Sequence, residues 1–174
     1  MGGKDTLAKV RKFIGRVKPF AVQCSNGAYI PIYKDIDDTV LYDHVLGNNT
    51  IGTYVIREDG KVSFGVIDID GDKENLGPLK KLGLKIYSLF PEFKRVLEFS
   101  GRRGYHVWIF MDKLENPQFV KELITARLKL NNIRNVEVFP KQSSLEGKKL
   151  GSLIKIPLGK HRKGGWSKII KGDI

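Results

Sequence analysis

Two aspartates at alternate positions carry the clearest chemical signal in this sequence. Asp68 and Asp70 lie in the run VIDID, residues 66–70. Because side chains alternate along a β-strand, both carboxylates point to one face while the two isoleucines enter the core. Neighbouring carboxylates repel each other, and a hard divalent cation such as Mg²⁺ or Mn²⁺ relieves that repulsion through oxygen ligands. The pair therefore predicts a metal site, with a solvated strand end as the alternative.

A glycine-bounded turn with two arginines follows in the run SGRRGYHVW, residues 100–108. Its glycines allow backbone N–H groups to approach a ligand closely and form an anion-binding nest. Arg102 and Arg103 carry planar guanidinium groups that match phosphate oxygens. His106, on the return strand, can donate to a phosphate. The segment predicts a phosphate site, with a hairpin tip bearing exposed arginines and a structural histidine as the alternative.

The chain is strongly basic. It has 31 Lys and Arg residues against 19 Asp and Glu residues, a formal net charge of +12, and residues 141–174 hold nine of the basic and two of the acidic residues. A basic stripe attracts a polyanion through counterion release and electrostatic steering. Lys141, Lys148 and Lys149 are candidates for contacts with a nucleic-acid backbone, with a solvated loop as the equal alternative.

In this order, the VIDID strand and the SGRRGYHVW turn resemble the first two motifs of the archaeo-eukaryotic primase superfamily. Two later segments continue the resemblance. IKIPLGKHRKG, residues 154–164, is similar to the family's late K-x-P…H-x-K-T-G element, with Gly-Gly in place of Thr-Gly after Lys163. VEVFPKQ, residues 136–142, is similar to the D-x-x-F-P-x-Q segment of stand-alone and CRISPR-associated primase-polymerases. Residues 44–54 also resemble the leader region of that branch.

The resemblance implies a nucleotidyltransferase, a DNA primase or polymerase that joins NTPs or dNTPs on a single-stranded template and releases pyrophosphate. The template is expected to be DNA, with RNA left open. The family's two-metal chemistry assigns Mg²⁺ or Mn²⁺ to Asp68, Asp70 and Glu137, a glutamate where the family usually has aspartate. The resemblance further implies nucleotide-binding residues in two segments. They are Ser100, Arg102, Arg103, Gly104, His106, Lys155 and His161.

Two other functions fit parts of the sequence. VIDIDG resembles the nucleophile motif of haloacid dehalogenase-type phosphatases, but Asp72 stands where that family has Thr or Val, and no late acidic pair follows. A catalytically inert RRM-like nucleic-acid-binding domain would use aromatic strand motifs that are missing here. Its clustered carboxylates would also repel RNA. Metal-dependent nucleic-acid binding without pyrophosphate release would favour the inert domain.

The elements that must position these residues follow from apolar spacing and from turn residues. We expect strands at 27–34, 51–57, 61–70, 93–100, 104–111, 134–139 and 152–157. We expect helices at 39–46, 75–90 and 117–130. Pro91 marks the end of the second helix, and Pro117 suits the first turn of the third. Tyr54 and Trp166 are expected to pack in the core, with base stacking as the alternative.

From about residue 61 the expected order is β-α-β-β-α-β, which is the split βαβ or ferredoxin-like order. We therefore expect an α/β (α+β) protein with an RRM-like, ferredoxin-like sheet lobe over about residues 61–174. A smaller N-terminal α/β lobe covers about residues 1–60, and the two together form one catalytic domain over residues 1–174. The resemblance implies that this is the archaeo-eukaryotic primase fold.

The composition excludes several other classes of protein. A chain of 174 residues with 41% hydrophobic and 29% charged residues can bury a core and is not disordered. One cysteine, Cys24, excludes a disulfide scaffold. The chain has neither a signal peptide nor a run of roughly 20 apolar residues. We expect a cytoplasmic protein without membrane contact, acting as part of a longer protein or of a replication or CRISPR-type system.

Overall fold

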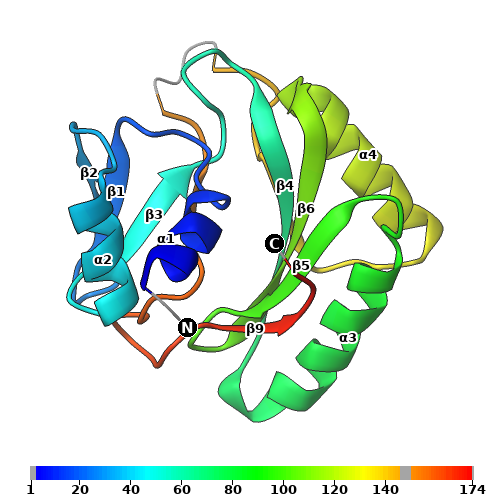
Figure 1. Ribbon diagram of the computed structural model, residues 1–174. Coiled ribbons are helices and arrows are strands. Elements are labelled where there is room, and N and C mark those ends of the chain that lie inside the picture. The colour runs from blue at the N-terminus through cyan, green and yellow to red at the C-terminus, as the bar shows by residue number, and fades with distance from the viewer. Residues whose placement is uncertain (1–2, 146–149, 174) are drawn as a thin grey trace.

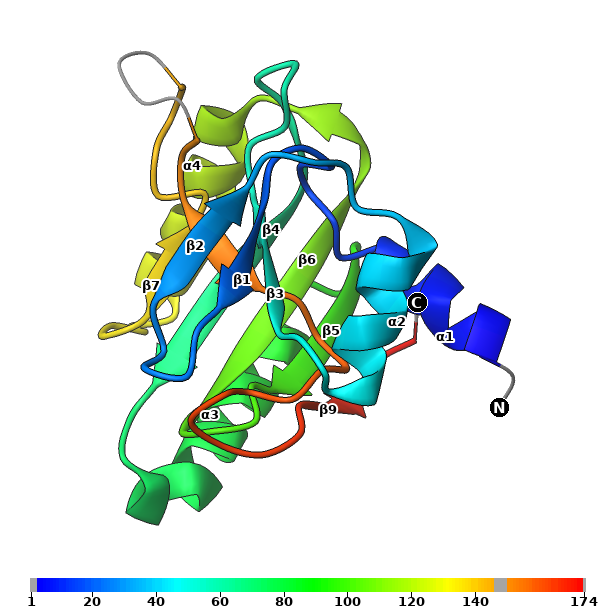
Figure 2. The same cartoon turned by 90° about the vertical axis from the view of Figure 1, so that its left-hand side faces the viewer.

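Two antiparallel sheets face each other in the computed structural model, which describes residues 3–145 and 150–173 (Figure 1). The elements in chain order are α1 (Gly3–Arg11), β1 (Phe20–Gln23), β2 (Tyr29–Ile32), α2 (Asp38–Leu46), β3 (Ile51–Tyr54), β4 (Val62–Asp70), the 3₁₀ helix η1 (Lys73–Asn75), α3 (Leu76–Ser88), β5 (Lys94–Phe99), β6 (Gly104–Glu115), α4 (Pro117–Leu130), β7 (Glu137–Phe139), β8 (Leu153–Lys155) and β9 (Lys168–Lys171). The smaller sheet has the order β2-β1-β3-β8, and the larger has β7-β4-β6-β5-β9. Figure 2, which looks at the smaller sheet, shows it lying across the larger one.

The larger sheet confirms the expected ferredoxin-like order. Its elements β4-α3-β5-β6-α4-β7 place the strands side by side as β7-β4-β6-β5, with every pair antiparallel. Helices α3 and α4 cover one face of this sheet, and the smaller sheet with α1 and α2 lies on the other side (Figure 1). Gly65 on β4 lets α4 approach closely, because a Cβ there would overlap Ile124. Among the described residues, no helix is long and apolar enough to cross a membrane.

The strand expected at 152–157 exists as β8, but it joins the other sheet. It pairs with β3, so the smaller sheet takes one strand from the second half of the chain and the expected lobe boundary near residue 60 does not hold for β8. The physical reason is the open edge of β3, whose backbone groups need partners once they are buried. Pairing there brings Lys155, at the end of β8, against the larger sheet.

Several short elements were not expected from the sequence. They are α1, β1 and β9. β1 and β9 contain only four residues each, so alternation of apolar and polar side chains is too brief to distinguish them from loops. Each becomes a strand because neighbouring strands supply the hydrogen bonds, β2 and β3 for β1 and β5 for β9.

An aromatic cluster fills the space between the two sheets. Trp108 of β6 is fully buried, and its ring meets Phe13 edge-on at a centroid distance of 4.9 Å and Phe64 at 5.1 Å. Tyr54 is buried as expected, whereas Trp166 is 43% exposed and its ring lies over Gly47 at the end of α2. The expectation of core packing therefore holds for Tyr54 and is wrong for Trp166.

A buried histidine joins α2 to the segment that follows β8. His44 is fully buried, its Nδ1 accepts a hydrogen bond from the Ile51 N–H at 3.1 Å, and its Nε2 donates to the Pro157 carbonyl at 2.9 Å. Gly159 lies against the ring, where a Cβ would overlap it. Burial and the neighbouring Lys155 lower the pKa of His44 to about 4, so the ring is neutral at physiological pH.

This arrangement predicts a loss of stability in mild acid. Folding lowers the pKa of His44 from 6.5 to about 4, so the unfolded chain binds the proton more readily. The free energy of unfolding should therefore fall as the pH decreases from about 6.5 towards 4, by at most about 3 kcal/mol for this group. Urea unfolding at pH 7, 6 and 5 should show a shallower pH dependence in His44→Gln than in the unmodified protein.

His161→Gln is measured beside it, because folding also lowers the pKa of the half-exposed His161 and this variant shows the share of the second histidine. His161→Gln should keep the part of the pH dependence that His44 contributes. Equal slopes in the unmodified protein and in His44→Gln would contradict the role assigned to His44.

Candidate active site

A cavity of about 180 Å³ between the two sheets collects most of the residues expected to do chemistry. Its lining comprises Gln23, Tyr29, Asp68, Asp70, Ser100, Arg102, Arg103, His106, Phe139, Leu153, Ile154, Lys155 and His161. Eight of these were expected as site residues, whereas Gln23 and Tyr29 come from β1 and β2 and were missed. Their contribution depends on how the smaller sheet docks, which no local pattern shows.

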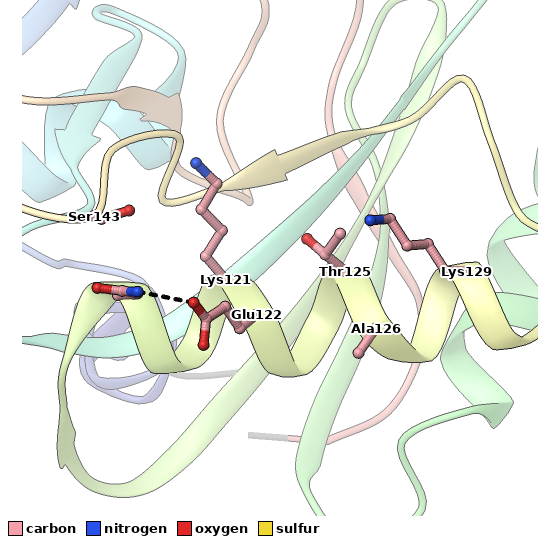
Figure 3. A pocket seen from close by; sticks show the side chains of 7 residues that line it. Lys121, Glu122, Thr125, Ala126, Lys129 and Ser143 are labelled. Carbon is pink, nitrogen blue, oxygen red and sulfur yellow. Dashed lines mark hydrogen bonds between the residues drawn. The ribbon is translucent and has the colours of Figure 1, made fainter.

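A larger hollow of about 440 Å³ lies along α4 and holds none of the expected residues (Figure 3).

Four charged or titratable residues form one row across the larger sheet. Asp68 of β4 lies opposite Glu137 of β7 on one side and opposite His106 of β6 on the other. His106 in turn lies opposite Glu98 of β5. Cross-strand neighbours in register share a face of the sheet, so the row faces the smaller sheet together. Three carboxylates in one row create a strongly negative strip that requires cations or protons.

Asp68 has a buried oxygen in this row that lacks a hydrogen bond. Its Oδ1 is buried and accepts no hydrogen bond from any described residue, and His106 Nε2 lies 3.5 Å away. Burial raises the pKa of Asp68, His106 opposes this, and Asp70, Glu137 and Glu98 raise the pKa further. An unpartnered buried carboxylate oxygen facing a cavity has the chemistry of a ligand for a hard cation.

Asp70 lies at the end of the same strand and closer to solvent. Its Oδ2 accepts a hydrogen bond from Arg103 at 3.0 Å, and both side chains are about half exposed. Gly104 makes room for this carboxylate, because a Cβ there would lie 2.6 Å from Asp70 Oδ1 and 2.5 Å from the Ile69 carbonyl. Gly104 is therefore required sterically beside Asp70, while its expected contact with a nucleotide stays a prediction.

The expected third carboxylate is next to Asp68 in register but turns outward. The side chain of Glu137 is 61% exposed and pairs with Lys141 Nζ at 2.8 Å. Within residues 3–145 and 150–173, no three His, Cys, Asp or Glu side chains gather closely enough to hold a metal ion. The structure therefore brings together Asp68 and Asp70 and leaves Glu137 paired with Lys141. Lys148 and Lys149 lie outside the described residues.

Two glycine-rich loops interlock beside the carboxylates. The Gly165 N–H donates to the Gly101 carbonyl at 2.6 Å, which joins the 100–104 turn to the loop after β8. A Cβ on Gly164 would overlap the same carbonyl and lie 3.0 Å from Arg102 Cβ. A glycine at position 164 therefore has a steric cause, because this contact leaves no room for a side chain.

His161 enters the cavity from this second loop. Its Nδ1 accepts a hydrogen bond from the Lys163 N–H at 3.0 Å, so Nε2 carries the proton in the neutral ring. The amide nitrogen of Gln23 lies 3.4 Å from this Nε2. Burial, Lys155 and Arg102 lower the pKa of His161 to about 4, which keeps the ring neutral near pH 7. The stem of Lys163 lies against the turn at Gly27.

Glu98 is a further residue beside the site that sequence reasoning missed. It is fully buried and accepts hydrogen bonds from His106 Nδ1 at 3.0 Å, Trp108 Nε1 at 2.9 Å and Lys155 Nζ at 3.2 Å. A signal was present, because Glu98 is an acid within the apolar run Val96–Phe99 and pairs with His106 across the tight turn. His106 itself is only 6% exposed, so it lies deeper than a phosphate-binding residue on a hairpin tip would.

The chain is similar to known proteins in sequence and in fold. Residues 9–170 match the family described as "TOTE conflict system, Archaeo-Eukaryotic Primase domain". The primase-polymerase domain of cyanophage S-2L is similar in structure, with a TM-score of 0.54 and 14% identity over 98% of this chain and 90% of that chain. The polymerase domain of Mycobacterium tuberculosis Ligase D, solved with DNA, gives a TM-score of 0.46 and 11% identity over 95% of this chain and 72% of that one. No curated protein matches.

The close contact between the two loops predicts that one added methyl group at position 164 lowers the stability of the protein. In Gly164→Ala the new Cβ meets backbone rather than a flexible side chain, so the loops must separate. The free energy of unfolding should fall by about 1–3 kcal/mol, as for an overpacked core. Gly77→Ala on α3 is the matched control, because a Cβ there meets nothing within 4 Å. The control should be neutral or up to about 1 kcal/mol more stable. Urea unfolding measures both, and equal effects would exclude a tight loop contact.

Proposed function

The chain belongs to the archaeo-eukaryotic primase domain family of the TOTE conflict system, and we propose that it is a template-dependent nucleotidyltransferase that joins nucleoside triphosphates and releases pyrophosphate. One observation carries this proposal. The buried, unpartnered oxygen of Asp68 shares a cavity with basic side chains from two separate loops. Acidic and basic groups that line one cavity suit a ligand made of a cation and a polyphosphate.

The acidic wall fits a divalent cation. Asp68 and Asp70 would hold Mg²⁺ or Mn²⁺, and Glu137, in register with Asp68, is the proposed third ligand if it exchanges its contact with Lys141. Both exposed ion pairs near this wall, Asp70 with Arg103 and Glu137 with Lys141, contribute little stability and can be exchanged at low cost. When bound, the cation would lower the pKa of an attacking hydroxyl and offset charge at the α-phosphate.

The basic wall fits the triphosphate. Arg102, Lys155 and His161 line the cavity, and Ser100 adds a buried hydroxyl at its floor. Guanidinium and ammonium groups bind phosphate oxygens through charge-assisted hydrogen bonds. His161 is neutral with the proton on Nε2, so it donates one hydrogen bond without adding charge. Hydrogen bonds hold Lys155 and His161 before the ligand arrives, which favours stabilisation of charge that develops during the reaction.

The reaction is a displacement at the α-phosphate. The 3′-oxygen of the growing strand forms a bond to the α-phosphorus, and the bond from this phosphorus to the bridging oxygen of the β-phosphate breaks. The electron pair leaves with pyrophosphate, and the hydroxyl proton passes to solvent. The negative charge that grows on the leaving pyrophosphate is the charge that Arg102, Lys155 and His161 are placed to stabilise.

The test of this function is nucleotide incorporation on single-stranded DNA with Mn²⁺ or Mg²⁺, with and without a primer. Asp68→Asn should reduce incorporation at least about 100-fold, because it removes a charged group that acts in the transition state. The variant should be as stable as the unmodified protein or more stable, because burial disfavours the charge of Asp68. Asp112→Asn, an exposed change further along β6, is the control and should keep full activity.

Pyrophosphate release distinguishes this function from an inert binding domain. A protein that binds nucleic acid and metal but releases no pyrophosphate would refute the proposed activity and favour the inert RRM-like alternative. Wild-type incorporation by Asp68→Asn would remove Asp68 from the catalytic residues.

Template binding should depend on salt. The net charge of +12 predicts that phosphate contacts dominate affinity for single-stranded DNA. The logarithm of the association constant should fall linearly with the logarithm of salt concentration, at roughly 0.7 per neutralised phosphate. Fluorescence anisotropy with a labelled oligonucleotide measures this slope, and an affinity independent of salt would contradict electrostatic template binding.

A further inference from the structure

Within residues 3–145 and 150–173, the most buried acidic side chain is Glu98, which contacts two residues that line the proposed nucleotide cavity but does not line it. Glu98 is fully buried on β5, where an ionised carboxylate is unstable unless donors replace its water. Although burial opposes ionisation, Lys155 and His106 lower the pKa of Glu98 to about 2. The carboxylate is therefore ionised, and its oxygens already accept three hydrogen bonds from the protein. Its role is thus not to bind a ligand directly.

The donors to Glu98 come from both sheets. His106 lies opposite Glu98 on the neighbouring strand of the larger sheet, and Lys155 reaches it from β8 of the smaller sheet. Lys155 Nζ also donates to the Ile156 carbonyl at 2.9 Å. Because an ammonium has three N–H donors, one donor remains for the cavity that Lys155 lines.

The same contact orients His106. Its Nδ1 is bonded to Glu98, so Nε2 is turned towards Asp68 Oδ1 at 3.5 Å and towards the cavity. A ring flip would place Cδ2 at Glu98 and Cε1 at Asp68, and the 3.0 Å hydrogen bond from Nδ1 would be lost. Glu98 thus determines which atom of His106 and which donor of Lys155 face the ligand, although it touches neither the cavity nor Asp68.

Of the three donors to Glu98, only Lys155 and His106 need its negative charge. A glutamine could still accept from Trp108 on its one carbonyl oxygen, but its hydrogen bond with His106 would lose the charge assistance that a carboxylate gives. Its amide nitrogen would then present N–H groups to Lys155, where donor would face donor. If Glu98 served only to satisfy the buried Trp108 indole, a neutral acceptor would suffice. The carboxylate is specifically suited to Lys155 and His106.

We propose that Glu98 is a positioning residue of the nucleotide site, which fixes Lys155 and His106 from opposite sheets for binding one triphosphate. This inference rests on the proposed nucleotidyltransferase function. It goes further by assigning affinity for the nucleotide to a residue that contacts no nucleotide.

The test compares Glu98→Gln with Glu98→Asp and with Glu92→Gln. Glu92 is the matched control, because it is an exposed glutamate that pairs with Arg127 away from the cavity. Titration of the folded proteins with Mg²⁺-dATP, well below their melting temperatures, should show at least tenfold weaker binding in Glu98→Gln. Glu98→Asp should recover part of the affinity because it keeps the charge, and Glu92→Gln should bind as the unmodified protein does. Affinity for single-stranded DNA should stay within twofold in all three variants.

A second readout separates positioning from stability. In the unmodified protein without nucleotide, the Nδ1 proton of His106 should give a downfield imidazole N–H resonance from its hydrogen bond to Glu98. Glu98→Gln should shift or lose this resonance, and Glu92→Gln should not. A merely structural role predicts a lower melting temperature for Glu98→Gln with unchanged Mg²⁺-dATP affinity of the folded protein, and that result would overturn the proposal.

A further pair of variants applies if Glu98→Gln does not fold. Glu98→Gln/Lys155→Met removes both buried charges together, and it is compared with Lys155→Met alone. Weaker Mg²⁺-dATP binding by the double variant supports positioning through His106, whereas equal binding overturns the proposal. If the proposed nucleotidyltransferase function is wrong, the unmodified protein will neither bind Mg²⁺-dATP nor incorporate nucleotides. This result is distinct from every outcome that concerns Glu98 alone.

Discussion

The central interaction of the site is the contact of the buried Glu98 carboxylate with Lys155 and His106. An ionised group in the interior is tolerated only with close donors, and here they must come from β6 and β8 at once. The two sheets therefore have to meet in the arrangement that brings Lys155 to the larger sheet. The cavity is a consequence of that meeting, because its acidic wall belongs to β4 and much of its basic wall to loops that β6 and β8 hold.

Simple steric features bring acidic and basic side chains to the same cavity. Asp68 and Asp70 share a face because strands alternate, and Gly104 leaves space beside Asp70. The basic loops approach them because Gly101 and Gly164 lack side chains at their contact. The result is an acidic wall with one unsatisfied oxygen and a basic wall whose donors are already in place. Such a preorganised site suits a ligand that combines a cation with phosphates.

The passage of the chain from one sheet to the other makes the site possible. After β7 in the larger sheet, the chain enters the smaller sheet as β8 and then returns to the larger one as β9. His44 secures this path by hydrogen bonds to both β3 and the segment after β8. A neutral histidine is required there, so stability in acid and the geometry of the site are linked through the same segment.

The sequence by itself determined the local features of this protein. Alternation placed Asp68 and Asp70 on one face, the SGRRG turn set the hairpin of β5 and β6, and apolar spacing predicted α3, α4 and the ferredoxin-like order. These features depend on neighbours a few residues apart. Only the tertiary structure decided that β8 pairs with β3, that Gln23 and Tyr29 line the cavity, that Glu137 turns to Lys141 and that Glu98 holds Lys155. Each of these contacts joins segments on different strands or sheets, or chooses between ion-pair partners, and such choices depend on how the sheets dock and on which buried charges find partners.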